Sequence, residues 1–278
     1  MVKTIVFNGG LGNQMFQYAF YLRMKRKYPL SLFLFDIKLA QGCHNGYELD
    51  KIFKINSLSK AKLYRKLKKR FPKTMSTCHT MIQEHSIEYD LRLLKTMPFL
   101  TRYNGFWQSE KYFSPVDKLV RKSFTFRDEL LSDRTKDEAS KLKSINSIAV
   151  HVRRGDYVRN ADYYGLCSEA YYAKAIDFMR ERVSNPMFVF FSDDVEWVKS
   201  HIPCDGAKYV TWNKGADSWQ DMYLMSCCKH NIIANSSFSW WGAWLNSNAD
   251  KIVIAPTPWC DYSADYDIVP IQWQKIKR

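Results

Sequence analysis

Five short apolar runs in the second half of the chain are each followed by polar residues and, in four cases, by a stretch with helical spacing. Strands that alternate with helices form a parallel sheet, because each crossover helix returns the chain to the end of the sheet at which the previous strand began. This half is therefore predicted to be a Rossmann-like α/β domain. The expected strands are 148–152, 187–191, 208–210, 232–234 and 252–255. Two helices are expected near 168–182 and 218–228, and two more are expected to end at about residue 200 and at residue 245.

The start of the chain, "TIVFNGGLGNQMFQYA", has the same pattern. A strand at 4–7, a turn from Gly9 to Gly12 and a helix at 13–27 precede Pro29, and a second strand is expected at 30–35. Two Rossmann-like α/β domains facing each other across a cleft explain both halves. The expected domains are 1–145 and 146–278, with additional helices near 59–70 and 128–142.

Composition and length narrow the class of protein. A chain of 278 residues with 46% hydrophobic residues can build a substantial core. No apolar run approaches the roughly 18 to 20 residues of a membrane span, and no apolar signal region follows Met1, so a cytoplasmic location is expected. The seven cysteines have neither paired nor metal-ligand spacing, so we expect reduced core thiols rather than disulfides or zinc ligands.

The net charge of +14 favours anionic partners. Much of the excess lies in "KAKLYRKLKKRFPK", residues 60–73, which carries eight basic residues and no acidic one. Lys62, Arg65, Lys66 and Lys69 recur at helical spacing, so this helix is either a peripheral contact with anionic membrane or a solvated surface helix. Nucleic acid is not expected as a partner, because no recognition motif accompanies the charge.

The opening glycines do not complete a dinucleotide fingerprint. Gly10 and Gly12 fill two positions of G-x-G-x-x-G, but Met15 occupies the third, and no Gly-Lys-Ser/Thr follows. What remains is a glycine turn at a helix amino end, where backbone N–H groups favour phosphate or developing negative charge. Asn13 and Gln14 add amide donors. The alternative is a tight strand-to-helix turn without a ligand.

The segment "VHVRRGDY" places His151, Arg153 and Arg154 at the carboxyl end of a strand. Ligands of open α/β sheets bind outside such ends, and a guanidinium there can donate two parallel hydrogen bonds to a phosphate. The alternative is that Arg153 or Arg154 pairs with Asp156 or another carboxylate and fixes the loop.

The next strand ends in "FSDD". Ser192 is expected to cap a helix, with Asp193 and Asp194 in the first turn, where the helix dipole favours carboxylates. The ligand alternative has one of these carboxylates accepting from a ribose hydroxyl or a base amino group.

The segment "DMYLMSCCKHNIIANSSFSWWGAWLN" gathers hydroxyls and backbone N–H groups at the start of a helix, which suits a second phosphate contact. Its tryptophans, Trp240, Trp241 and Trp244, are expected to pack in a core or domain interface, with stacking on a base or sugar as the alternative. Asp265 and Asp267 form a D-x-D pair after the last predicted strand, but no metal site is expected from two aspartates at this place.

Together, "GGLGNQMFQYA", "HVRRGDY" and the segment from Asp221 to Asn246 resemble the bacterial α-1,2-fucosyltransferases, and "NGFWQSEKYF" at 104–113 is similar to another segment of that family. The arginine segment alone is shared with α-1,6 and protein O-fucosyl enzymes, whereas the three segments together are specific. The resemblance covers residues 5 to about 260. It implies a GT-B-like fold, GDP-fucose as donor, no metal requirement and inversion at the anomeric carbon of fucose.

The resemblance also implies roles for individual residues. Arg153 binds the β-phosphate, His151 lies beside the nucleotide, and Asn13 orients the reacting groups. Asp221 stands fifteen residues before Ser236, as does the guanine-binding aspartate of related enzymes. The remaining donor contacts implied are Gly10, Gly12, Asp193, Asp194, Asn235, Ser236, Ser237 and Phe238, with Ser237 at a position where the family commonly has threonine.

The predicted reaction transfers L-fucose to the 2-hydroxyl of a terminal β-galactose in an O-antigen or capsule type of surface glycan, which a lipid carrier can hold. Stabilisation of the departing GDP by Arg153 and helix amino ends is expected to dominate. Asp156 is the candidate base on the acceptor hydroxyl, and a dissociative route with weak base assistance is the alternative. Other interpretations are a fucosyltransferase of different linkage, an NAD-dependent oxidoreductase and a non-catalytic basic protein that binds membranes or glycans.

Overall fold

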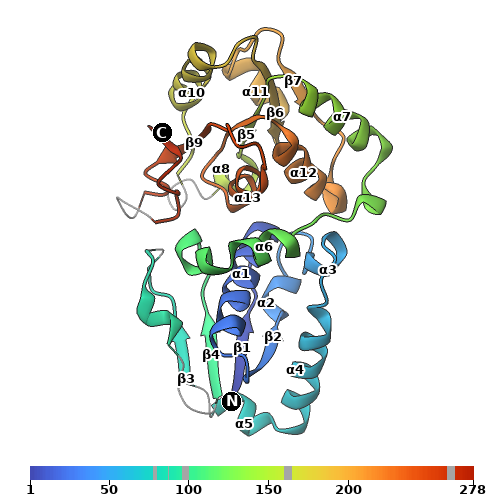
Figure 1. Ribbon diagram of the computed structural model, residues 1–278, viewed down its shortest axis with the longest axis vertical. Coiled ribbons are helices and arrows are strands. Elements are labelled where there is room, and N and C mark those ends of the chain that lie inside the picture. Colours follow the sequence, from blue (N-terminus) through green and yellow to red (C-terminus); the bar gives the residue numbers. More distant parts are fainter. Residues whose placement is uncertain (78–79, 87, 96–99, 160–164, 262–266) are drawn as a thin grey trace. The chain divides into compact units, whose positions relative to one another are not determined.

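The computed structural model describes residues 1–77, 80–86, 88–95, 100–159, 165–261 and 267–278. The chain forms two compact units, Met1–Asp128 and Glu129–Arg278, each built on a parallel sheet (Figure 1). No helix among the described residues is long and apolar enough to cross a membrane.

The first unit contains a parallel sheet in the order β2-β1-β4-β3. Val2 of β1 pairs with Leu32 on one side and with Leu100 on the other, so the order reverses beside the first strand. The strands are β1 (Val2–Val6), β2 (Leu32–Asp36), β3 (Thr80–Gln83) and β4 (Leu100–Asn104).

Helices cover both faces of this sheet because successive strand residues point to opposite sides. Phe33 and Phe35 of β2 contact Tyr21 of α1 (Leu11–Lys27), whereas Leu34 packs with Tyr64 of α4 (Leu58–Arg70). Figure 1 shows α4 running beside β2. The remaining helices of this unit are α2 (Lys38–Gln41), α3 (Leu49–Ile52), α5 (Pro72–Thr77) and α6 (Asp117–Ser123), with 3-10 turns at Leu91–Leu94, Glu110–Tyr112, Ser114–Val116 and Asp128–Leu130.

The second unit has a parallel sheet in the order β7-β6-β5-β8-β9-β10. Counted along the chain, this is the 3-2-1-4-5-6 order of the Rossmann fold, with the reversal between β5 and β8. The strands are β5 (Ser147–Val152), β6 (Met187–Ser192), β7 (Lys208–Val210), β8 (His230–Ile232), β9 (Val253–Thr257) and β10 (Gln274–Lys277).

This sheet is also covered on both faces. Ile148 and Val150 of β5 pack against α10 and α11, and Ala149 packs against α7 and α12. The result is a three-layer α/β/α arrangement around an apolar parallel sheet. The helices are α7 (Asp133–Ser144), α8 (Gly155–Arg159), α10 (Glu169–Arg182), α11 (Val195–His201), α12 (Trp219–Cys227) and α13 (Ser237–Leu245), with a 3-10 turn at Gly215–Asp217.

The division between the units lies after Asp128, whereas the sequence placed it after residue 145. Helix α7 joins the second unit through Glu138, which pairs with Lys208 at 2.5 Å, and through Thr135, which donates to Asn213 at 3.3 Å. Strand rhythm alone could not assign this helix, because it precedes the first strand of the sheet that it covers.

Several predicted elements differ from the observed ones. Helix α1 begins at Leu11, two residues before the predicted start, and α7 begins at Asp133 rather than 128. The strand at 252–255 was expected to be the last, but β10 follows and pairs in parallel with β9. The six cysteines described carry free thiols, and Cys78 lies outside the described residues.

Candidate active site

The reversal of strand order between β5 and β8 marks the expected ligand site of the second unit. In open α/β sheets, ligands bind outside the carboxyl ends of the strands on either side of such a reversal. Here β5 ends in His151 and Val152 and leads to Arg153, and β8 leads to Asn235 and Ser236. The sheet order therefore brings together two of the polar segments singled out in the sequence.

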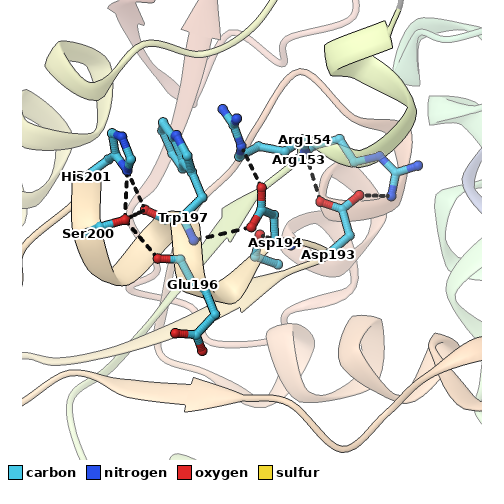
Figure 2. A network of polar contacts seen from close by, with 9 residues as sticks. Arg153, Arg154, Asp193, Asp194, Glu196, Trp197, Ser200 and His201 are labelled. Carbon is cyan, nitrogen blue, oxygen red and sulfur yellow. Dashed lines mark hydrogen bonds and ion pairs between the residues drawn. The ribbon is translucent and has the colours of Figure 1, made fainter.

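Arg153 is held in place by a carboxylate from the loop after the neighbouring strand, β6. Its Nη1 lies 2.8 Å from Oδ2 of Asp193, and Oδ1 of the same carboxylate accepts from the backbone N–H of Arg154 at 2.9 Å (Figure 2). Gly155 permits this approach, since a Cβ there would lie 2.5 Å from Oδ2 of Asp193. Asp193 thus connects the loop after β5 to the loop after β6.

Arg154, unlike Arg153, contacts Asp194 and an aromatic ring. Its Nε donates to Oδ2 of Asp194 at 3.1 Å, and its guanidinium lies 3.8 Å from the centre of the Trp197 ring (Figure 2). Asp194 is the N-cap of α11, accepting from the N–H of Trp197 at 3.2 Å. These contacts give Arg154 a structural role, because its planar group is stacked and paired at once.

The capping prediction for this loop was partly wrong. Ser192 does not cap the helix; its Oγ accepts from the N–H of Asp194 at 3.0 Å, and Asp193 and Asp194 precede α11 instead of lying in its first turn. The alternative in which arginines pair with carboxylates is observed, with Asp193 and Asp194 as the partners. A guanidinium has five N–H donors, so the pair with Asp193 does not exclude a phosphate contact by Arg153, whose side chain is 26% exposed.

His151 is a buried neutral imidazole beside these arginines. Burial, and next the charge of Arg153, lower its pKa from 6.5 to about 3. Its Nδ1 has no hydrogen-bond partner among the described residues, and its ring lies 6.0 Å from that of Phe238. An imidazole of this kind can hydrogen-bond a ligand at neutral pH but carries no positive charge there.

The loop after β8 is built by its own side chains. Asn235 donates to the carbonyls of Gly165 at 3.1 Å and Trp259 at 3.0 Å, and Oγ of Ser236 caps α13 by accepting from the N–H of Phe238 at 3.3 Å. Asn235 and Ser236 are buried, whereas Ser237 and Phe238 are half-buried. The structure thus gives Asn235 a positioning role and leaves Ser237 and Phe238 as the more accessible residues of this turn.

Asp221 lies in the first turn of α12, where burial raises the pKa of its carboxyl. This pKa rises from 3.8 to about 7, against the opposing hydrogen bond from Nδ2 of Asn213 at 2.8 Å. Asn213 in turn accepts from Thr135. Sequence reasoning missed Asn213, although its place before a Gly and a helix start is typical of a residue that shapes a loop.

In the first unit, the conformational need for glycine falls on Gly9. Its φ is +77°, and a Cβ there would lie 2.5 Å from Nδ2 of Asn13. Gly10 has an extended conformation as the N-cap of α1, while Gly12 is buried within the helix. Sequence reasoning named Gly10 and Gly12 and did not single out Gly9, whose left-handed φ is the local signal for glycine.

Side-chain amides organise the same turn. Oδ1 of Asn13 accepts from Nε2 of Gln108 at 2.7 Å, so the segment after β4 reaches the residue expected to orient the reacting groups. Gln14 was expected to donate to a ligand, but it is fully buried and donates to the carbonyls of Gly9 and Gly46, each at 2.9 Å. Gln108 lies in the quoted "NGFWQSEKYF" segment but was not singled out there.

The remaining predictions concern three tryptophans and two aspartates. Trp240, Trp241 and Trp244 are buried and contact one another, which confirms the packing prediction. Asp156 belongs to α8, but its side chain lies outside the described residues, as does Asp265 of the D-x-D pair.

Comparison with known proteins identifies the chain at the level of family. The model of glycosyl transferase family 11 matches residues 1–277. The chain belongs to glycosyl transferase family 11. An α-1,2-colitosyltransferase of Escherichia coli is 37% identical to this chain, over 97% of each of the two chains. Human galactoside α-(1,2)-fucosyltransferase 1 is 29% identical over 91% of this chain and 67% of its own.

A solved structure supports the fold of this family 11 chain. The α-1,6-fucosyltransferase NodZ of Bradyrhizobium, in crystals soaked with GDP-fucose, aligns over 88% of this chain and 92% of its own, with a TM-score of 0.50 and 12% identity. At that identity the likeness concerns the fold alone. The predicted α/β, GT-B-like class is confirmed, as is the predicted family. The protein is a glycosyltransferase, which replaces the oxidoreductase and binding-protein interpretations.

Proposed function

We propose that the protein transfers L-fucose from GDP-fucose, with inversion, to the 2-hydroxyl of a terminal β-galactose in a surface glycan. The observation that carries the proposal is Arg153, fixed by Asp193 at the strand-order reversal of the Rossmann sheet in a family 11 chain. The names of the colitosyl and fucosyl relatives support the α-1,2 linkage, and the name of the human relative supports the galactoside acceptor.

The reaction breaks the bond between the anomeric carbon and the β-phosphate oxygen, and the electron pair leaves on that oxygen. In this proposal the guanidinium of Arg153 donates to the phosphate as charge develops, while Asp193 keeps the guanidinium oriented. The amino end of α13 contacts the same diphosphate through the backbone N–H and the hydroxyl of Ser237, while Phe238, whose N–H is donated to Ser236, lies beside it. These groups replace a metal in balancing the charge, so the proposed transfer needs no divalent ion.

The nucleotide half of the donor is assigned to Asp221 and His151. A carboxylate is a good acceptor for the two neighbouring N–H groups on the edge of guanine. Because the pKa of Asp221 is about 7 in the free protein, binding of guanine to the carboxylate should release part of a proton near neutral pH. Neutral His151 hydrogen-bonds the nucleotide through Nδ1 in this assignment.

The acceptor hydroxyl attacks the anomeric carbon from the opposite face and loses its proton. Asp156 is our candidate base, and Asn13 is assigned to orientation of the reacting groups through the amide that Gln108 holds. If Asp156→Asn retains most of kcat, the dissociative route with weak base assistance is favoured.

A second donor is supported by the α-1,2-colitosyltransferase relative. Colitose is 3-deoxy-L-fucose, so the two GDP-sugars differ by one hydroxyl on the transferred sugar. A site that hydrogen-bonds this hydroxyl rejects the deoxy sugar by about 10⁴-fold, whereas a site without such a bond discriminates far less. The ratio of kcat/KM for the two donors therefore decides between the proposals.

The test is release of GDP from each donor in the presence of EDTA, with and without lactose. Lactose-dependent release from GDP-fucose, and an α-1,2 linkage in the product by NMR, is the expected result. Faster release from GDP-colitose would favour the second donor. Absence of release from both donors, with no shift of melting temperature by GDP, would refute both.

A further inference from the structure

The net positive charge of the chain comes entirely from the first unit. Met1–Asp128 holds 24 of the 42 lysines and arginines and 9 of the 28 acidic residues, which leaves a formal charge of +15. Glu129–Arg278 holds 18 basic and 19 acidic residues and has a formal charge of −1. Because Arg153 and Arg154 belong to the second unit, the excess charge is not accounted for by the arginine cluster of the candidate site.

Helix α4 and the residues just after it contain about half of this excess. Residues 60–73 include eight basic side chains and no acidic one. A run of this kind usually repels itself and favours disorder, yet residues 58–70 form a regular helix. Contacts on the inner face of the helix explain its stability.

The inner face of α4 is anchored to the sheet. Ala61 and Tyr64 are buried, and Oη of Tyr64 donates to Oδ2 of Asp36 at 3.1 Å and accepts from Nη1 of Arg102 at 2.9 Å. Arg102 and Asp36 form an ion pair at 2.7 Å. This polar network fixes the rotation of α4 about its own axis, so the opposite face points outward in a fixed orientation.

The outward face of α4 combines charge with apolar side chains. Leu63 is 37% exposed, and Phe71, just after the helix, is 52% exposed. None of the basic residues of this face forms an ion pair with another described residue. We define the α4 surface as these two apolar residues together with exposed Lys62, Arg65, Lys66, Lys69 and Arg70.

We propose that the α4 surface docks on an anionic lipid membrane. Basic side chains are attracted to the negative headgroup layer, and apolar side chains between them enter the boundary with the acyl chains. A helix of 13 residues extends about 20 Å, which is long enough for several headgroups. Leu63 and Phe71 favour lipid over nucleic acid, since apolar side chains at these positions add nothing to phosphate contacts.

The experiment is cosedimentation with vesicles of phosphatidylcholine, alone or mixed with phosphatidylglycerol. The whole protein should bind the mixed vesicles, bind phosphatidylcholine alone much more weakly, and lose binding as salt is raised. Lys62→Glu, Lys66→Glu and Lys69→Glu combined should lower the partition coefficient at least about 100-fold, since each basic residue contributes about fivefold. Leu63→Ser with Phe71→Ser should lower it severalfold.

The matched control reverses the same number of charges in the second unit, at exposed Lys141, Lys143 and Lys174. It changes the net charge equally but should leave vesicle binding within about twofold of wild type. Equal losses in the two triple variants, or no loss in the α4 triple variant, would overturn the proposal. Unchanged vesicle binding by the Leu63 and Phe71 variant, with displacement of vesicles by double-stranded DNA, would overturn it in favour of nucleic acid. Circular dichroism melts establish that every variant is folded.

Discussion

Gly155 shows how a position without a side chain determines the geometry of a charged one. A Cβ at this exposed position would lie 2.5 Å from Oδ2 of Asp193 and would displace the carboxylate that holds Arg153. Gly155→Ala should therefore lower kcat/KM by about 10- to 100-fold, because a misplaced guanidinium stabilises the leaving phosphate less well. The melting temperature should change little.

Steady-state kinetics on acceptor-dependent GDP release measure this effect. Gly42→Ala is the matched control, since the nearest atom to its added Cβ is 3.8 Å away. Equal kcat/KM for wild type and Gly155→Ala would show that the position of Asp193 is unimportant for the reaction.

Two titrating groups of the second unit make the free energy of unfolding depend on pH in opposite directions. The pKa of Asp221 is raised from 3.8 to about 7, so between these values the folded state binds more protons and stability falls as pH rises. The pKa of His151 is lowered from 6.5 to about 3, so between these values the unfolded state binds more protons and stability rises with pH. From about pH 4 to 6.5 the two slopes oppose each other.

Substitution of either group should expose the slope of the other. The free energy of unfolding of Asp221→Asn, minus that of wild type, should increase with pH by up to about 1.4 kcal/mol per pH unit from about pH 4 to 6.5. That of His151→Gln should fall by a similar amount. Urea unfolding at a series of pH values measures both, and parallel profiles for the three proteins would contradict the assigned pKa shifts.

At the scale of elements, α11 depends on one carboxylate for two contacts. Asp194 caps the helix through the N–H of Trp197 and pairs with Arg154. Asp194→Ala should lower the free energy of unfolding by about 1 to 2 kcal/mol, mainly through loss of the cap. If Arg154 is structural, kcat/KM below the unfolding transition should stay within about threefold of wild type. A loss above 100-fold with unchanged stability would instead place Asp194 on the substrate.

The turn before α1 provides a second test at this scale. Gly9→Ala forces a left-handed φ on alanine and brings its Cβ against the amide of Asn13, so stability should fall by about 1 to 2 kcal/mol or more. Gly10→Ala keeps an extended backbone and meets only the ring of His44 at 2.9 Å, so its cost should be smaller and removed by His44→Ala. Urea unfolding of the three variants gives the comparison, and equal costs at Gly9 and Gly10 would contradict it.

Sequence patterns predicted the strands that form a continuous or nearly continuous apolar run. The predicted strand at 208–210 agrees with β7, and the apolar runs near 148 and 187 agree with β5 and β6. Strands β4 (LTRYN) and β10 (QKIK) were missed because their alternating polar residues give no continuous apolar run. Their pairing depends on partners distant in sequence, which local periodicity does not report.

The sequence predicted which types of residue form the candidate site, but it did not predict most of the contacts between them. Glycines, arginines and serines after strands pointed to anion binding, but the partners of Arg153 and Arg154 follow from the adjacency of β5 and β6. The same holds for Gln108 on Asn13, which depends on β4 lying beside β1. Residues brought together by sheet order are visible only once that order is known.

For the molecule as a whole, two α/β units of different charge share the proposed work. The second unit, nearly neutral, carries the arginine cluster and the residues assigned to GDP. The first unit, strongly basic, carries the glycine turn and the α4 surface. The proposed reaction requires only one of the two adjacent arginines after β5 to act on the donor.

Acceptor-dependent kcat/KM of Arg153→Ala and Arg154→Ala, measured with the active GDP-sugar, tests this requirement most directly. Arg153→Ala should lose roughly 2 to 4 kcal/mol of transition-state stabilisation, about 30- to 1,000-fold in kcat/KM, with its melting temperature nearly unchanged. Arg154→Ala should lose less than about tenfold but melt at a lower temperature, because it holds α11 through Asp194 and Trp197. Wild-type kcat/KM in Arg153→Ala would contradict the proposed donor site.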